Sequence, residues 1–126
     1  MVKLLLIGAG GFLGAVARYG LSGLVQGRIG SSFPGGTLAV NVVGCLALGF
    51  LVGLFEERQL LGPDVRLFLG IGILGSFTTF STFGFETLEL VRIGSFRLAG
   101  VNAAANLILG LGAVWCGRAL VRGLVP

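Results

Sequence analysis

The chain has 126 residues, of which 55% are hydrophobic and only 11% are charged, and its formal net charge is +4. Soluble domains carry about 25% charged residues, so this composition excludes an ordinary soluble protein and favours a membrane protein with little extramembrane mass. There is no histidine, and Cys45 and Cys116 lie in separate apolar runs, where buried free thiols are expected rather than a metal cluster.

Four apolar segments follow one another, each near the ~20 residues that a helix needs to cross a bilayer. They are predicted over residues 4–24, 37–55, 65–91 and 98–120, with short polar or charged connections between them. The first segment starts like a signal peptide but has no clear small-residue cleavage site, so a retained helix is expected. We therefore expect an all-α membrane protein in which residues 1–126 form one domain of four transmembrane helices.

The basic residues are almost evenly divided between the two sides that four spans define. One side would carry Lys3, Arg58, Arg66, Arg118 and Arg122, and the other Arg28, Arg92, Arg97 and, near a helix end, Arg18. Topology follows the Lys/Arg bias of short loops, so this small difference hardly fixes one orientation. A chain that inserts both ways can form an antiparallel homodimer, and inverted pairs with a site near the midplane recur in membranes. A single orientation, set by one or two dominant charges, stays open.

The first span contains a glycine-rich segment and ends near a basic residue. Residues 8–14, Gly-Ala-Gly-Gly-Phe-Leu-Gly, look like a dinucleotide-binding turn, but that fingerprint needs an acidic residue about 20 positions on, and none precedes Glu56. Close helix packing is the expected role, since small residues let transmembrane helices approach. Arg18 is either a charge that draws an anion toward a pore mouth or a snorkelling anchor, and both interpretations stay open.

Asparagines stand out in the second and fourth spans. Asn41 alone is explained by an interhelical hydrogen bond, which is worth about 1 kcal/mol in membranes. Asn102 and Asn106 lie four residues apart on one helical face, where with Gly110 they favour a hydrated stripe over pure packing.

The most informative segment is residues 75–83 in the third span, Gly-Ser-Phe-Thr-Thr-Phe-Ser-Thr-Phe, with five hydroxyl residues and three phenylalanines. Polar or irregular backbone at membrane depth is tolerated where it is buried in protein or lines a watery path. Gly75 beside this cluster suggests a broken helix, whose freed carbonyls can hold a cation, while positive ring edges can face an anion. Ordinary packing, with hydroxyls bonded to the carbonyl four residues back, is the alternative.

Three segments resemble the Fluc (CrcB-like) fluoride channel family. They are residues 11–19 (Gly-Phe-Leu-Gly-Ala-Val-Ala-Arg-Tyr), 36–44 (Gly-Thr-Leu-Ala-Val-Asn-Val-Val-Gly) and 70–83, which ends in the hydroxyl-rich segment. The length and the four-span layout match as well, so the resemblance covers essentially the whole chain.

The resemblance implies an antiparallel, dual-topology homodimer in the cell inner membrane, with two fluoride pores and a third helix broken in its middle. It implies that carbonyls matching Gly75 and Thr78 hold a central structural Na⁺ from both subunits. The residues that match the family's pore positions are Asn41, the vestibule Arg18, the ring pair Phe80 and Phe83, and the neighbouring hydroxyls Ser81 and Thr82. On the family's fourth-helix polar track, often lined by serines or a tyrosine, Asn106 fits, whereas Asn102 and Gly110 depart.

The expected function is passive fluoride conduction, in which donors replace the ion's water and weak binding at several positions lets the ion leave. A multidrug transporter of similar size would need a carboxylate in the first span, which has none. A purely structural subunit would not require the polar residues of the third and fourth spans. Glu86 and Glu89 lack a histidine or a nucleophile–base partner, so an enzyme is not expected, and Glu86 is expected near an interface, paired with an arginine.

Overall fold

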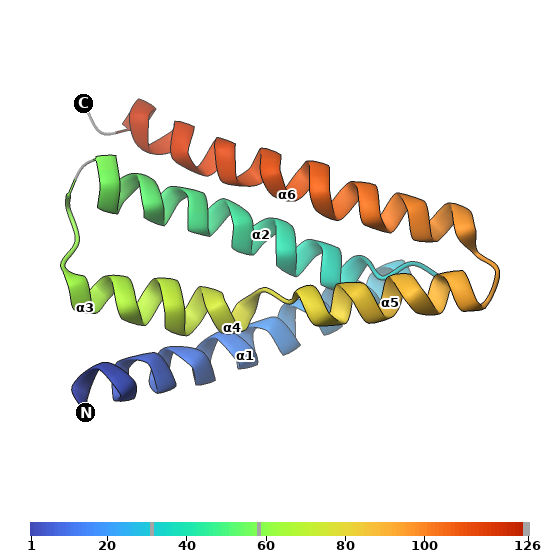
Figure 1. The fold of residues 1–126 in the computed structure, drawn as a ribbon, viewed down its shortest axis with the longest axis horizontal. Coiled ribbons are helices and arrows are strands. Elements are labelled where there is room, and N and C mark those ends of the chain that lie inside the picture. Colours follow the sequence, from blue (N-terminus) through green and yellow to red (C-terminus); the bar gives the residue numbers. More distant parts are fainter. Residues whose placement is uncertain (31, 58, 125–126) are drawn as a thin grey trace.

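All regular structure is helical in the part of the chain that the computed structural model describes, which is residues 1–30, 32–57 and 59–124. The helices are α1 (Val2–Ile29), α2 (Gly35–Val52), η1 (Gly53–Glu57), α3 (Pro63–Arg66), η2 (Leu67–Leu74), α4 (Gly75–Phe77), α5 (Phe80–Arg92) and α6 (Phe96–Leu124) (Figure 1). The segments η1 and η2 are π-helical continuations of their neighbours. Arg58, which the sequence assigned to the side of the termini, lies outside the described residues.

The helices begin and end at residues that suit the ends of helices. Pro63 stands at the start of α3, where its missing N–H and fixed φ cost nothing. Gly30 and Gly94 have φ of 83° and 79°, in the left-handed region that glycine adopts without strain, and they follow α1 and α5. The Gln26 amide donates to the carbonyls of Gly30 and Phe33 and closes the turn between α1 and α2.

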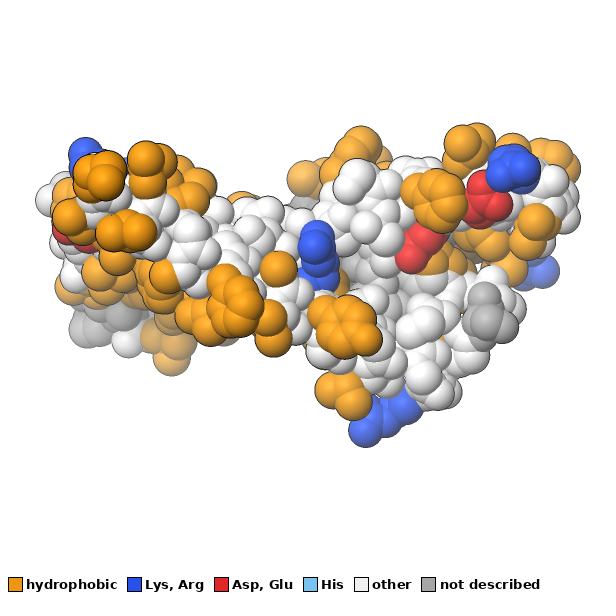
Figure 2. All heavy atoms as spheres, turned by 90° about the horizontal axis from the view of Figure 1, so that it is seen from below, with side chains coloured by type: hydrophobic (Ala, Val, Ile, Leu, Met, Phe, Trp, Pro, Cys, Tyr) orange, Lys and Arg blue, Asp and Glu red, His pale blue; other side chains and the backbone are white. Residues whose placement is uncertain are grey.

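Four helical stretches are long and apolar enough to cross a membrane, which confirms the all-α membrane fold. They are Val2–Ile29, Gly35–Glu56, Pro63–Arg92 and Phe96–Leu124, and each extends beyond the predicted range at both ends. Large apolar side chains face outward, including Phe12 at 70% and Trp115 at 71% exposure. Figure 2 shows such side chains spread along one face, with charged groups mainly toward its ends and one basic group near its middle. A surface of this kind needs lipid or another protein against it.

The chain crosses from one end of the bundle to the other four times. Both termini and the connection from η1 to α3 lie at one end, and the α1–α2 and α5–α6 connections lie at the other (Figure 1). Helix α2 packs along α6, and α1 packs against η2 and α4. Helix α5 contacts α6, so the two halves of the third span have different main neighbours.

The third span is broken near its middle, as the sequence predicted. Helix α4 ends at Phe77, and α5 begins at Phe80. Thr78 and Thr79 between them are extended, with φ/ψ of −79°/153° and −147°/109°. Gly75 is itself helical, with φ/ψ of −63°/−31°, so the chain leaves the helix three residues after the glycine.

Glycines bring the helices into contact, which confirms a packing role for the glycine-rich first span. A Cβ on Gly14 would collide with the backbone carbonyl of Ile73, and one on Gly10 would lie 2.5 Å from the Phe68 carbonyl oxygen. A similar crossing joins α2 to α6, where a Cβ on Gly117 would meet the Leu46 carbonyl. Backbone atoms cannot move aside as a flexible side chain can, so these positions accept no larger residue without separating the helices.

We expect Gly14→Ala to destabilise the protein by about 1–3 kcal/mol, because it inserts a methyl group against the main chain of the third span. Gly8→Ala is the matched control on the same helix, since nothing lies within 4 Å of a Cβ at that position. Thermal unfolding in detergent compares the two variants. Equal stability of both would contradict the close crossing of α1 and η2.

Candidate functional site

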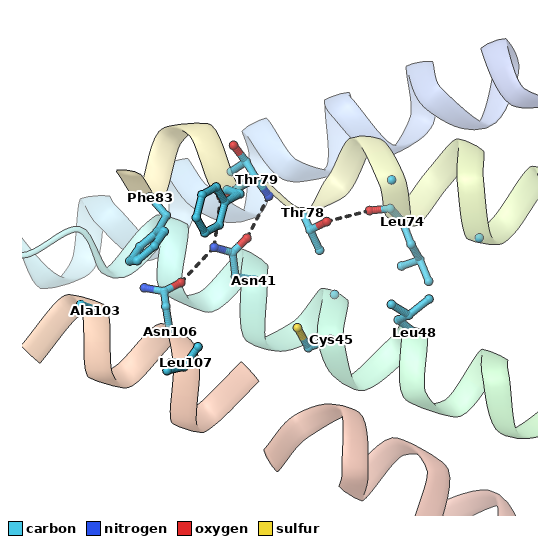
Figure 3. Close-up of a pocket in the computed structure, with 14 residues that line it drawn as sticks. Asn41, Cys45, Leu48, Leu74, Thr78, Thr79, Phe83, Ala103, Asn106 and Leu107 are labelled. Carbon is cyan, nitrogen blue, oxygen red and sulfur yellow. Dashed lines mark hydrogen bonds between the residues drawn. The ribbon is translucent and has the colours of Figure 1, made fainter. Parts of the chain in front are cut away.

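The break in the third span is held by a two-way hydrogen bond between Asn41 and Thr79. The Thr79 N–H donates to Asn41 Oδ1 at 2.9 Å, and Asn41 Nδ2 donates to the Thr79 carbonyl at 3.2 Å. In a continuous helix this N–H would bond the carbonyl of Gly75, four residues back. The Asn41 side chain, which comes from α2, therefore replaces a helical hydrogen bond of the third span at the point where that helix stops (Figure 3).

The Thr79 side chain starts the second half of the span. Its Oγ1 accepts from the Thr82 N–H at 3.2 Å, donates to Thr82 Oγ1 at 2.9 Å, and lies 3.4 Å from Ser81 Oγ. This is the N-cap geometry that favours threonine at a helix start. Thr78 instead donates to the Leu74 carbonyl, four residues back, at 3.1 Å, as the packing alternative expected. The hydroxyls thus divide between capping α5 and finishing the helix before it.

The end of α4 leaves carbonyl oxygens without helical partners. Thr78 N–H makes the last bond, to Leu74, and Thr79 N–H turns to Asn41, so the carbonyls from Gly75 to Thr78 stand at the helix end without helical donors. Such oxygens lie at the negative end of the helix dipole and suit a hard cation. Among the described residues, no group of three or more His, Cys, Asp or Glu side chains could hold a metal ion.

A cavity of about 520 Å³ lies beside the break and unites most of the predicted site. The predicted residues that line it are Asn41, Gly75, Thr78, Phe80, Phe83 and Asn106. The rings of Phe80 and Phe83 have centroids 5.4 Å apart and are tilted by 58°. Phe80 is 84% exposed in the single chain, so its ring lies at the open side of the bundle. The cavity is therefore lined by two side-chain amides (Asn41 and Asn106), two phenyl rings (Phe80 and Phe83) and the residues at the end of the broken helix.

A chain of amides runs from this cavity into the protein. Asn41 donates to Asn106 Oδ1 at 2.9 Å, Asn106 donates to Asn102 Oδ1 at 3.1 Å, and Asn102 donates to Thr87 Oγ1 at 2.9 Å. Thr87 in turn donates to the Phe83 carbonyl at 2.7 Å. Asn102 is fully buried, so the stripe predicted on the fourth span is at this residue a bonded interior contact and not a hydrated surface.

A second cavity, of about 450 Å³, is lined by two of the three remaining predicted residues, Arg18 and Thr82. Arg18 lines it with Thr82, Thr37 and Thr79, and Thr79 lines both cavities. Ser81 lines neither of the two and is placed only by its proximity to Thr79.

Next to the second cavity, Glu86 differs from its predicted role. It accepts a hydrogen bond from Thr37 Oγ1 at 2.9 Å, and its Oε2 is buried without a hydrogen-bond partner among the described residues. The acidic residue that pairs with an arginine on this helix is Glu89, whose Oε1 lies 2.7 Å from Arg92. Glu89 is nearer the end of the span, where a long basic side chain can reach water while pairing.

Sequence reasoning missed Thr79, Thr37 and Thr87 as members of these networks. For Thr79 the signal was present, since threonine is among the residues preferred at an N-cap. For Thr37 and Thr87 no local signal exists, because their partners lie on other helices, 49 and 15 residues away.

The fold and its cavities define a class of protein, a small four-span helical membrane protein with a polar, aromatic-walled space at a helix break. The chain belongs to the CrcB family, whose model, described as CrcB-like protein, Camphor Resistance (CrcB), matches residues 5–118. It is 50% identical over 117 residues to the fluoride-specific ion channel FluC of Nitratidesulfovibrio vulgaris, covering 93% of this chain and 94% of that protein.

Two further relatives have the same name. The FluC protein of Maridesulfovibrio salexigens is 44% identical over 125 residues, which cover 99% of each chain. That of Opitutus terrae is 48% identical over 122 residues, covering 95% of this chain and 92% of its own. These matches confirm the family that the sequence motifs indicated.

Replacement of Thr79 by Ala is expected to cost about 1 kcal/mol of stability, the usual cost of losing an N-cap side chain. Thr79→Ser keeps the Oγ that accepts from Thr82, so this variant should lose no more than about half as much stability as the alanine variant. Chemical or thermal unfolding of both variants measures the difference. An alanine variant as stable as the serine variant would show that the cap contributes nothing.

Proposed function

We propose that this protein is a fluoride-specific ion channel, which lets fluoride leave the cell passively, and that it is not an enzyme. The cavity at the helix break carries the proposal, because side-chain amides and two phenyl rings line it. The relatives that share the family are named as fluoride channels, which supports the same function. The four candidate spans support a location in the membrane, which we assign to the cell inner membrane.

The proposed path uses donors of different strength. Fluoride is small and strongly hydrated, so Asn41 and the hydroxyls of Ser81 and Thr82 would replace its water at short range. The positive edges of Phe80 and Phe83 would offer a weaker surface from which the ion can leave. Arg18, in the second cavity, would raise the local concentration of anions at the entrance. Asn106 belongs to the same path, since it lines the cavity with Asn41.

The proposed working unit is an antiparallel homodimer in which residues 1–126 of each copy form one four-helix domain. Phe80, almost fully exposed beside the cavity, supports a second copy that closes this side. The freed carbonyls of Gly75 and Thr78, doubled by the second copy, would hold a structural Na⁺. The ion's charge would stabilise oxygens that otherwise repel one another at the joint between the two copies.

A proton-coupled exporter of cationic drugs is the alternative from another class. It would need an ionisable carboxylate on the first span, and α1 contains none. The buried carboxylate nearest the cavities, Glu86, is bonded to Thr37 on another helix. Fluoride loss that is fast and independent of a proton gradient separates the channel from the exporter.

Reconstituted into liposomes loaded with fluoride, the protein should release the ion rapidly, as followed with a fluoride electrode. Phe80→Ile, which removes a ring edge, and Asn41→Asp, which removes both amide donors and adds a negative charge, should each slow release by about tenfold or more. Phe85→Ile is the matched control, since Phe85 is exposed on the same helix and lines neither cavity. Unchanged rates in both site variants would remove these residues from the path, and a silent wild-type protein would overturn the function.

Native mass spectrometry of the detergent-solubilised protein should find two chains with one Na⁺. Removal of sodium should weaken that species, because the carbonyls at the joint lose their shared cation. A tag at one terminus should be accessible from both sides of the membrane in a population of molecules. Monomers, sodium-free dimers of equal stability, or tags found on one side only would contradict this assembly.

A further inference from the structure

The amide chain beside the cavity has a fixed direction, which decides what Asn106 can do. Asn41 Nδ2 donates to Asn106 Oδ1 at 2.9 Å. Asn106 Nδ2 donates to the backbone carbonyl of Asn102 at 3.0 Å and to its Oδ1 at 3.1 Å, which engages both amide hydrogens. Asn106 therefore presents its oxygen, and not its hydrogens, to Asn41.

Main-chain groups at both ends enforce this direction. The Thr79 N–H can only donate, so the oxygen of Asn41 must face it. The carbonyl of Asn102 can only accept, so the nitrogen of Asn106 must face it. Turning either amide over would set like groups against each other and leave buried donors and acceptors unpaired. The arrangement is therefore a property of the fold and not of one side-chain rotamer.

The Asn41 amide nitrogen already donates to two oxygens, so an anion that binds this nitrogen has to replace one of them. One of these oxygens is the Thr79 carbonyl, which belongs to the main chain and to the two-way pair with Asn41. The other is Asn106 Oδ1, which sits on a side chain and makes a single bond to Asn41. The bond to the Asn106 oxygen is therefore the one that an anion can replace without breaking a hydrogen bond to the main chain.

We infer that Asn106 is a specificity-determining residue, whose carbonyl oxygen occupies the Asn41 donor and admits only an anion that binds this donor more strongly. The inference rests on the proposed fluoride function and deepens it. It assigns to Asn106 the role of a competing acceptor, in contrast to Asn41, which is the donor that the ion takes over.

The competition favours a compact anion. Hydrogen bonds to a charged acceptor are roughly twice as strong as those between neutral groups, so an anion can displace the amide oxygen. Coulomb attraction falls with distance, so chloride, whose larger radius keeps its charge farther from the N–H, gains less from the exchange than fluoride. Fluoride therefore displaces the neutral Asn106 oxygen from the Asn41 donor more readily than chloride does, and this difference separates the two halides.

Asn106→Leu tests the inference, because leucine has the same branching and number of heavy atoms as asparagine and removes the competing oxygen. We expect the ratio of chloride efflux to fluoride efflux to rise by about tenfold, the factor for one hydrogen bond. Leu107→Ala is the matched control, since it enlarges the same cavity without touching the amides and should leave chloride excluded. Loss of fluoride efflux with chloride still excluded would make Asn106 a direct donor and overturn the inference. Chloride leak equal in both variants, or unchanged chloride exclusion in Asn106→Leu, would overturn it as well.

A measurement on the wild-type protein decides the matter even where the leucine variant does not fold. The chain has only three asparagines, Asn41, Asn102 and Asn106, so labelling asparagine with ¹³C and ¹⁵N gives three side-chain amides for NMR. Sodium fluoride, and not sodium chloride at the same concentration, should shift the Asn106 carbonyl carbon and the Asn41 amide protons. A shift of the Asn106 amide protons without its carbonyl, or no fluoride-specific shift, would contradict the inference. Failure of the proposed function is distinct, since it is seen as a wild-type protein that passes no fluoride.

Discussion

The two-way bond between Asn41 and Thr79 is the interaction on which the rest of the site depends. A helix inside a membrane stays continuous because no water is there to satisfy freed backbone groups. Here the Asn41 side-chain amide supplies both a donor and an acceptor to the backbone of one residue of the third span, Thr79, so the helix can stop without leaving the N–H and C=O of that residue unsatisfied. The oxygens released at Gly75, the cap on α5 and the position of Phe80 all follow from this stop.

The glycines make that bond possible by fixing how near the helices come. Gly44 on α2 lies where a Cβ would collide with Thr78 Cγ2, so the break can approach α2 closely. Gly10 and Gly14 seat the preceding half of the span on α1. Close packing of glycines thus positions the half of the third span that precedes the break, and the hydrogen bonds to Asn41 position the break itself. The cavity beside them is lined by α2, by both halves of the third span and by α6.

Much of this architecture could be predicted from the sequence, for physical reasons that differ among elements. Apolar runs of sufficient length give the four spans, and a dense group of hydroxyls in the third predicts a break, because lipid does not favour them. The role of Thr79 depends on a bond to Asn41, 38 residues away, which no local pattern reveals. The hydrogen bonds among Asn106, Asn102 and Thr87 likewise join two helices. The sequence of one helix therefore predicted that the stripe is polar, but not that Asn102 is buried or in which direction the hydrogen bonds run.

We propose that the helix break, held by Asn41, forms a path that fluoride takes and larger halides do not. The most direct test is the current through the protein in a planar bilayer, with fluoride as the anion on one side and chloride on the other. We expect a current whose reversal potential follows the fluoride gradient and does not change with chloride or with pH. A reversal potential that follows chloride or protons, or the absence of any current under a fluoride gradient, would contradict it.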